Sequence, residues 1–182
     1  MRQGADDLAR PLEDEYAPYY ATYVEKVSGT SPILSILTDQ QRELQRILSR
    51  LDDEEAGFRY APGKWSIKQV VGHLVDTERV FAYRAVCFAR GEAQALPGMD
   101  QDDYVADGEF DGRPMKELAG ECEIVRQSTI ALFSGLSERQ LERRGVASGY
   151  PFSTRALAFV IAGHERHHLD VLYERYGVER LS

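Results

Sequence analysis

Three of the four histidines in this sequence lie close together, in the run GHERHH at residues 163–168. His164 and His168 are four residues apart, so on a helix their rings stand one above the other on a single face. That spacing lets two ring nitrogens reach one cation at about 2.0–2.1 Å, the usual Zn–N distance. His167 lies toward the edge of this otherwise apolar face. His168 is therefore the better candidate ligand.

The fourth histidine, His73, belongs to an earlier segment with an apolar inner face. A single histidine on such a face is more often a hydrogen-bonded core residue than a metal ligand. Three inward histidines from two helices can nevertheless converge inside a helical bundle, where metal sites are built from facing helices. Three imidazoles with one open position resemble a catalytic rather than a structural site. The sequence therefore predicts a divalent metal held by His73, His164 and His168.

The run from His164 to His168 also matches H-E-x-x-H, the zinc metalloprotease signature in which the glutamate is the general base. The motif is short and arises easily by chance. The only ligand-type side chains that follow it are on the same helix or directly after it, namely Asp170, Glu174 and Glu179. No strand is expected that could pair with a peptide substrate. We therefore disfavour the protease interpretation.

Helical spacing of apolar residues, together with capping signals, predicts four long helices. Ser31 before Pro32, and Ser66 with Gln69 three residues on, are typical helix starts. Gly91 is a typical helix end. The predicted helices span 31–51, 66–91, 114–135 and 153–177, with a further helical turn after residue 137.

These helices predict an all-α fold, a four-helix bundle with short accessory helices. The connection 52–63 is polar, and the segment 92–112 is expected to be a long ordered loop, a kind of segment that is often functional. No strand pattern competes with the helices. The tyrosine-rich segment before residue 31 is expected to form a short helix or an aromatic strap across one end of the bundle.

Size and charge narrow the class of protein. The 182 residues suit one domain, 1–182. A net charge of −8 without any basic run argues against nucleic-acid binding. Residues 1–7 lack a signal-peptide core, and the longest apolar stretch, 156–163, is far shorter than the roughly 20 residues of a membrane span. Cys87 and Cys122 form no C-x-x-C pair, so reduced thiols and a cytoplasmic location are expected.

Several motifs together resemble the DinB/YfiT-like superfamily of metalloenzymes. They are YAPGKWSIKQ at 60–69, GHLVDTER at 72–79, FAYR at 81–84, LPGMDQDDY at 96–104 and GHERHH at 163–168. The resemblance covers the chain from about Tyr16 to Gly177. It implies a four-helix bundle, commonly a homodimer, with a metal held by three histidines. The first family ligand corresponds to His73, and the H-x-x-x-H pair corresponds to His164 and His168.

The resemblance also implies a thiol-dependent S-transferase, which couples a small-molecule thiol such as bacillithiol, mycothiol or glutathione to an electrophile. A divalent cation stabilises a thiolate, the nucleophilic form of a thiol. Hydrolysis by a metal-activated water is an alternative at the same site. A non-catalytic metal-binding stress-response module is another. Zn or Ni is the expected metal, and Fe or Mn also suits three imidazoles.

Four other polar residues are candidates for the pocket or for positioning. Glu165 is about 100° from His164 in helical phase, which favours the surface over a role beside the ligand. Arg84 falls on an inner helix face, so it needs an acidic core partner or an anionic cosubstrate. Asp103 and Tyr104, with Asp102, could line the pocket from the segment 92–112, although turn chemistry explains the acids equally well. None of these residues is assigned a catalytic role.

Overall fold

The computed structural model describes residues 8–27 and 31–180. The expectation that no signal-peptide core is present concerns residues 1–7, which lie outside the described residues. The single-domain boundaries 1–182 likewise remain a prediction. Among the described residues, no helix combines the length and the apolar character that a bilayer span requires. Cys87 and Cys122 are both free thiols.

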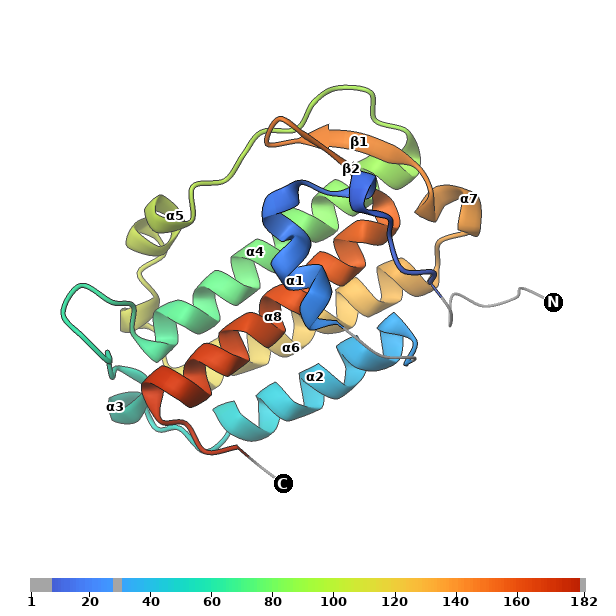
Figure 1. Cartoon of the computed structure of the whole chain (residues 1–182). Helices are drawn as coiled ribbons and strands as arrows, with labels where there is room; N and C mark the ends of the chain where they lie inside the picture. The colour runs from blue at the N-terminus through green and yellow to red at the C-terminus, as the bar shows by residue number, and fades with distance from the viewer. Residues whose placement is uncertain (1–7, 28–30, 181–182) are drawn as a thin grey trace.

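Four long helices form the bundle, as predicted. They are α2 (Ile33–Leu48), α4 (Ile67–Arg90), α6 (Met115–Ser134) and α8 (Thr154–Tyr176). Figure 1 shows them lying side by side, with α4 and α2 each in contact with both α6 and α8. The start of α2 is later than predicted, because Pro32 rather than Ser31 occupies its N-cap.

The ends of the two histidine-bearing helices are fixed by local signals. The Ser66 hydroxyl accepts a hydrogen bond from the Gln69 backbone N–H at 3.0 Å, and the Gln69 side chain accepts from the Ser66 N–H at 3.1 Å. This reciprocal capping box starts α4. Gly91 and Gly177 end α4 and α8 with φ of 87° and 70°, a conformation that glycine adopts without strain.

The segment 92–112 is not the continuous loop that the sequence predicts. It contains helix α5 (Gln101–Asp107) and a 3₁₀ turn at Phe110–Gly112. The Asp100 carboxylate caps α5 by accepting hydrogen bonds from the N–H groups of residues 102 and 103. The polar connection 52–63 also holds a short helix, α3 (Asp53–Ala56), whereas α7 (Glu138–Leu141) confirms the predicted turn of helix.

The expectation of no strands is wrong. Strands β1 (Arg144–Ala147) and β2 (Tyr150–Ser153) form an antiparallel hairpin in which Ala147 pairs with Tyr150. Its two turn residues, Ser148 and Gly149, have φ of 54° and 81°, which is typical of a tight hairpin turn. Four residues per strand are too few for an alternating pattern to stand out in the sequence.

The tyrosine-rich N-terminal segment forms a short helix, as expected. Two 3₁₀ turns, Glu13–Glu15 and Pro18–Tyr20, precede helix α1 (Ala21–Lys26). Figure 1 shows α1 lying against α8. The contact is backbone to backbone, because a Cβ atom on Gly163 of α8 would lie only 1.9 Å from the Tyr23 carbonyl oxygen.

The core consists of two apolar clusters with a polar layer between them. One cluster includes residues 156–162 of α8 and packs toward the hairpin. The other includes Leu169 and Leu172 of α8 and residues at the start of α4. Buried polar side chains of α8 lie between the two clusters, His164 and Glu165 among them. The polar layer is where chemistry can take place.

Candidate metal centre

The side chains of His73, His164 and His168 meet between α4 and α8. The Nε2 atom of His164 lies 3.0 Å from that of His73 and 3.2 Å from that of His168. The three candidate ligand atoms all lie within 4.8 Å of one another. Two imidazole nitrogens bound at about 2.0–2.1 Å to one tetrahedral ion are about 3.3–3.4 Å apart. The spacing therefore fits a single small divalent cation.

The chemistry of this donor set also fits a cation. A neutral imidazole nitrogen is either one donor or one acceptor. The Nε2 atom of His164 can therefore make a hydrogen bond to only one of its two neighbours. Three unprotonated Nε2 atoms around a divalent cation leave none of the three unsatisfied, and neutral imidazole suits Zn, Ni and Fe. The residues present thus fit the metal that the sequence predicts.

Burial keeps these imidazoles in the neutral form that a ligand needs. His73 is 3% exposed, and burial lowers its pKa to about 4, with a smaller contribution from the charge of His167. Burial lowers the pKa of His164 and of His168 well below 6.5, and repulsion between the neighbouring imidazoles adds to the effect. At neutral pH, protons therefore do not compete with a cation for these nitrogens.

Neighbouring side chains orient the rings. The hydroxyl of Thr77, one turn after His73, lies 3.3 Å from His73 Nδ1. A proton on Nδ1 then leaves Nε2 free for a cation, as is usual for histidine ligands. The ring of Trp65 lies 4.9 Å from that of His73, and the ring of Tyr23 lies edge-on to that of His164 at 5.4 Å. These aromatic contacts restrict the movement of both imidazoles.

A cavity of about 370 Å³ opens onto His73 and His164. One wall is aromatic and consists of Tyr20 and Tyr23 of the N-terminal segment with Phe81 of α4. Another part of the lining comes from residues 99–102 at the start of α5, which include two carboxylates. The histidine cluster is thus accessible to a small molecule.

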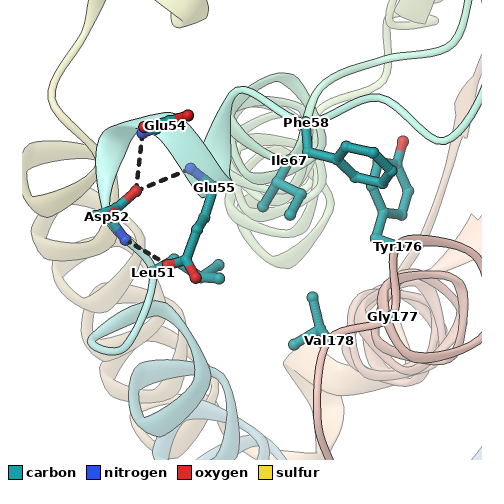
Figure 2. Close-up of a pocket in the computed structure, with 9 residues that line it drawn as sticks. All are labelled: Leu51, Asp52, Glu54, Glu55, Phe58, Ile67, Tyr176, Gly177 and Val178. Carbon is teal, nitrogen blue, oxygen red and sulfur yellow. Dashed lines mark hydrogen bonds between the residues drawn. The ribbon is translucent and has the colours of Figure 1, made fainter.

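A larger cavity, of about 510 Å³, lies where α8 ends and is shown in Figure 2. Two of its three acidic side chains, Asp52 and Glu55, are already engaged in a helix cap. The Asp52 carboxylate accepts hydrogen bonds from the N–H groups of residues 54 and 55, and the Glu55 carboxylate accepts from the Asp52 N–H. The remaining lining includes Phe58, Tyr176 and Val178, without histidine or cysteine. The candidate site is therefore the histidine cavity.

Glu165 is buried, not on the surface as the sequence analysis favours. It is 3% exposed, and its carboxylate accepts a hydrogen bond from Arg126 at 2.5 Å. Arg126 also donates to both carboxylate oxygens of Glu78 at 2.8 Å. Glu165 does not line the histidine cavity, so it is not placed to act as the base of an H-E-x-x-H site. Sequence reasoning missed Arg126 and Glu78. The signal that could have identified them is that both are charged residues on the inward faces of their helices.

The other candidates from the sequence have mixed outcomes. Arg84 is buried as predicted, but its hydrogen-bond partners are neutral, the Pro97 carbonyl oxygen at 2.9 Å and the Ser148 hydroxyl at 3.0 Å. Asp103 and Tyr104 are exposed on α5 and do not line the histidine cavity. Their neighbour Asp102 does line it.

His167 stands apart from the cluster. It is half-buried, and its ring lies 5.1 Å from the ring of His168 and 5.5 Å from that of Tyr23. The group of candidate ligand atoms within the described residues does not include it. The preference for His168 over His167 thus agrees with the geometry.

A comparison with models of known protein families shows which family this chain belongs to. The model of the DinB superfamily matches residues 36–172, a range that contains all three clustered histidines. The chain belongs to the DinB superfamily. This DinB chain is 26% identical over 127 residues to the protein of Oceanobacillus iheyensis named "Putative metal-dependent hydrolase OB0413", a match that covers 69% of this chain and 73% of that protein.

Solved structures show the same fold. YfiT from Bacillus subtilis, described as a probable metal-dependent hydrolase with an unusual four-helix bundle topology, matches with a TM-score of 0.71 and 16% identity over 94% of this chain and 95% of YfiT. A mycothiol-dependent maleylpyruvate isomerase matches with a TM-score of 0.63 and 14% identity, over 75% of this chain and 57% of that protein. The family and the three-histidine cluster together support a divalent metal in this DinB protein.

Proposed function

We propose that this DinB protein is a divalent-metal-dependent enzyme that transfers a low-molecular-weight thiol to an electrophile. One observation carries the proposal: three imidazoles converge and two of them, His73 and His164, line a cavity, while Glu165 is turned away and bonded to Arg126. Hydrolysis in an H-E-x-x-H site relies on that glutamate as a base. Thiol transfer does not need it, because a cation at the site lowers the pKa of the thiol and so supplies a nucleophile at neutral pH.

The side chains of the cavity have distinct roles in this proposal. His73, His164 and His168 hold the cation, and Thr77 keeps the ring of His73 in its binding orientation. The aromatic wall excludes water and packs against the electrophile. In the transfer the thiol proton leaves to solvent, a sulfur lone pair forms the new S–C bond, and the leaving group of the electrophile departs with the electrons of the broken bond.

The cysteines of the chain are not required for this reaction, since the nucleophile belongs to the thiol cosubstrate. Cys122 is buried, and burial raises its pKa, which keeps it in the unreactive thiol form. The partners are thus a small-molecule thiol and an electrophile. The homodimer and the cytoplasmic location expected from the sequence stay predictions.

Metal content and a thiol panel test the proposal. Protein purified without an affinity tag is analysed for metal and then incubated with 1-chloro-2,4-dinitrobenzene and a series of small thiols. We expect stoichiometric metal and a thioether product that requires both the metal and a thiol. His73→Ala should abolish product formation, whereas Tyr104→Phe, outside the cavity, should not. A protein without stoichiometric metal, whose melting temperature is unaffected by chelators, would contradict the proposal.

A metal-dependent hydrolase is the second candidate, because the Oceanobacillus protein and YfiT are both described in those terms. In this case Asp102 at the cavity would be the carboxylate that takes a proton from the attacking water. Ester cleavage without any thiol, lost in Asp102→Asn, would favour the hydrolase over the transferase. Bound metal without activity in either assay would favour a non-catalytic metal-binding module.

A further inference from the structure

Arg84 carries a positive charge inside the protein without a negative partner. It is 3% exposed, and its Nη2 atom donates to the carbonyl oxygen of Pro97 and the hydroxyl of Ser148. The buried Nε atom has no hydrogen-bond partner, and no carboxylate lies within ion-pair distance of Arg84, among the residues that the structure describes. Burying a guanidinium without a counter-charge costs several kcal/mol. A negative charge on a ligand nearby would offset that cost.

The aromatic wall of the metal cavity connects Arg84 to the cavity. The guanidinium carbon lies 5.6 Å from the centre of the Phe81 ring, and the Phe81 ring packs edge-on against that of Tyr20 at 5.8 Å. Both rings line the cavity with His73 and His164. Arg84 thus lies directly behind the wall that faces the candidate metal ligands.

Tyr20 lies close to the same arginine, because the Phe81 ring contacts both residues. Burial raises the pKa of Tyr20, and the charge of Arg84 opposes that rise. Tyr20 is therefore protonated at neutral pH. The phenolic proton is available for a hydrogen bond to another group. A positive charge behind a phenol makes it a stronger donor toward an anion.

We propose that Tyr20, with the buried charge of Arg84 behind it, forms a subsite in the metal cavity for a negatively charged oxygen of the substrate, such as a carboxylate. The proposal rests on the proposed function, since the metal site holds the thiol end of the same molecule. The geometry of the subsite nevertheless stands apart from that function and can be tested separately.

The carboxylates of Asp100 and Asp102 also line this cavity and would repel an anion. Both residues are exposed, so water and salt screen their charge. One oxygen of Asp100 is moreover bonded to two backbone N–H groups of α5. Arg84, in contrast, is buried, so its charge is screened less than the charges of the two exposed carboxylates. We therefore expect the cavity to prefer an anionic ligand over a neutral one.

The test uses the Co(II)-substituted protein and two thiols of equal size, 3-mercaptopropionate and 3-mercaptopropionamide. Their dissociation constants are measured from the sulfur-to-cobalt charge-transfer absorption. A hydrogen bond to a charged group predicts a preference for the carboxylate of roughly tenfold. Tyr20→Phe and Arg84→Met should remove that preference while the affinities for cobalt and for the amide stay unchanged. Tyr104→Phe removes a hydroxyl outside the cavity and should keep the preference.

Several results would overturn the subsite. One is an unchanged ratio of the two dissociation constants in Tyr20→Phe. Another is tighter binding of cysteamine than of either thiol, weakened by Asp102→Asn, because the acidic rim would then select a cation. If Arg84→Met does not fold, Tyr20→Phe decides alone, since phenylalanine keeps the ring packing. If no thiol changes the cobalt spectrum, the thiol function fails, and competition between acetate and acetamide for the cobalt site still tests the subsite.

Discussion

Replacing Gly163 with alanine tests whether the N-terminal helix is packed on α8 as the structure describes. An added Cβ atom would lie 1.9 Å from the carbonyl oxygen of Tyr23 and 2.4 Å from its carbonyl carbon. Favourable contacts between such atoms are at about 3.5–4.0 Å. Both atoms belong to the backbone, so no side-chain rotation relieves the overlap. Helix α1 must therefore move away from α8 by more than about 1 Å.

Two opposing effects set the size of the change in stability. Alanine in place of glycine inside a helix favours folding by about 1 kcal/mol. Overpacking a close contact disfavours it by about 1–3 kcal/mol. If α1 detaches, Val24, which is fully buried, loses a further contribution of about 1.5–3 kcal/mol. We expect Gly163→Ala to lower the free energy of unfolding by up to about 2 kcal/mol if α1 stays packed on α8, and by about 1.5–5 kcal/mol if α1 detaches.

Urea unfolding of wild type, Gly163→Ala and Gly120→Ala measures the effect. Gly120 is the matched control, because it lies inside α6 and an added Cβ would have no atom within 4 Å. Its replacement should raise the free energy of unfolding by up to about 1 kcal/mol. Since Tyr23 contacts His164, the Co(II) spectrum should change in Gly163→Ala only. Equal stabilisation by both alanines would refute the packing of α1 against α8.

Three further predictions concern the metal ligands and the buried charges. His168→Ala should weaken metal binding by more than about 100-fold, because losing even a residue that only orients a metal ligand lowers metal affinity by about 10–100-fold. Metal analysis after dialysis measures this loss, and His167→Ala is the control that should retain metal. The metal-free protein should lose stability as the pH falls from about 6.5 toward 4. The pKa of His73 is lowered to about 4 in the folded state, so the unfolded chain binds more protons between these pH values. Urea unfolding at pH 7 and pH 5 should show this loss, and His73→Phe should reduce the difference between the two pH values. Arg126→Met should cost about 3–5 kcal/mol, because two carboxylates stay buried without their counter-charge, and an unchanged melting temperature would contradict this.

Sequence patterns predicted the long helices and the metal cluster because the signals for both are local. The capping box at Ser66 and the glycines at the ends of α4 and α8 define the two helices by nearest neighbours. Once the helices are placed, the i, i+4 spacing determines the side that His164 and His168 share. The third histidine of the cluster, His73, follows because it points inward on the neighbouring helix.

The short elements could not be predicted in the same way. The segment before α5 and the hairpin are held together by tertiary contacts, for example the hydrogen bond from the N–H of Leu96 to the carbonyl oxygen of Val146. Arg84 links the same two segments through Pro97 and Ser148. Contacts between residues about 50 positions apart leave no periodic trace in either segment. Of residues 99–102, which line the cavity, the sequence analysis therefore anticipated only Asp102.

The error over Glu165 has a different cause, and it bears directly on function. Assigning a residue to the surface from its helical phase assumes that one side of the helix faces water. Helix α8 is instead in contact with α1, α2 and α4, so it has no such side along its central turns. His164 faces the cavity that α1 and α4 enclose, and the adjacent Glu165 faces Arg126 of α6. The backbone of α8 thus separates the candidate metal ligands from a buried cluster of one arginine and two glutamates. The motif H-E-x-x-H therefore spans two different environments and not one site.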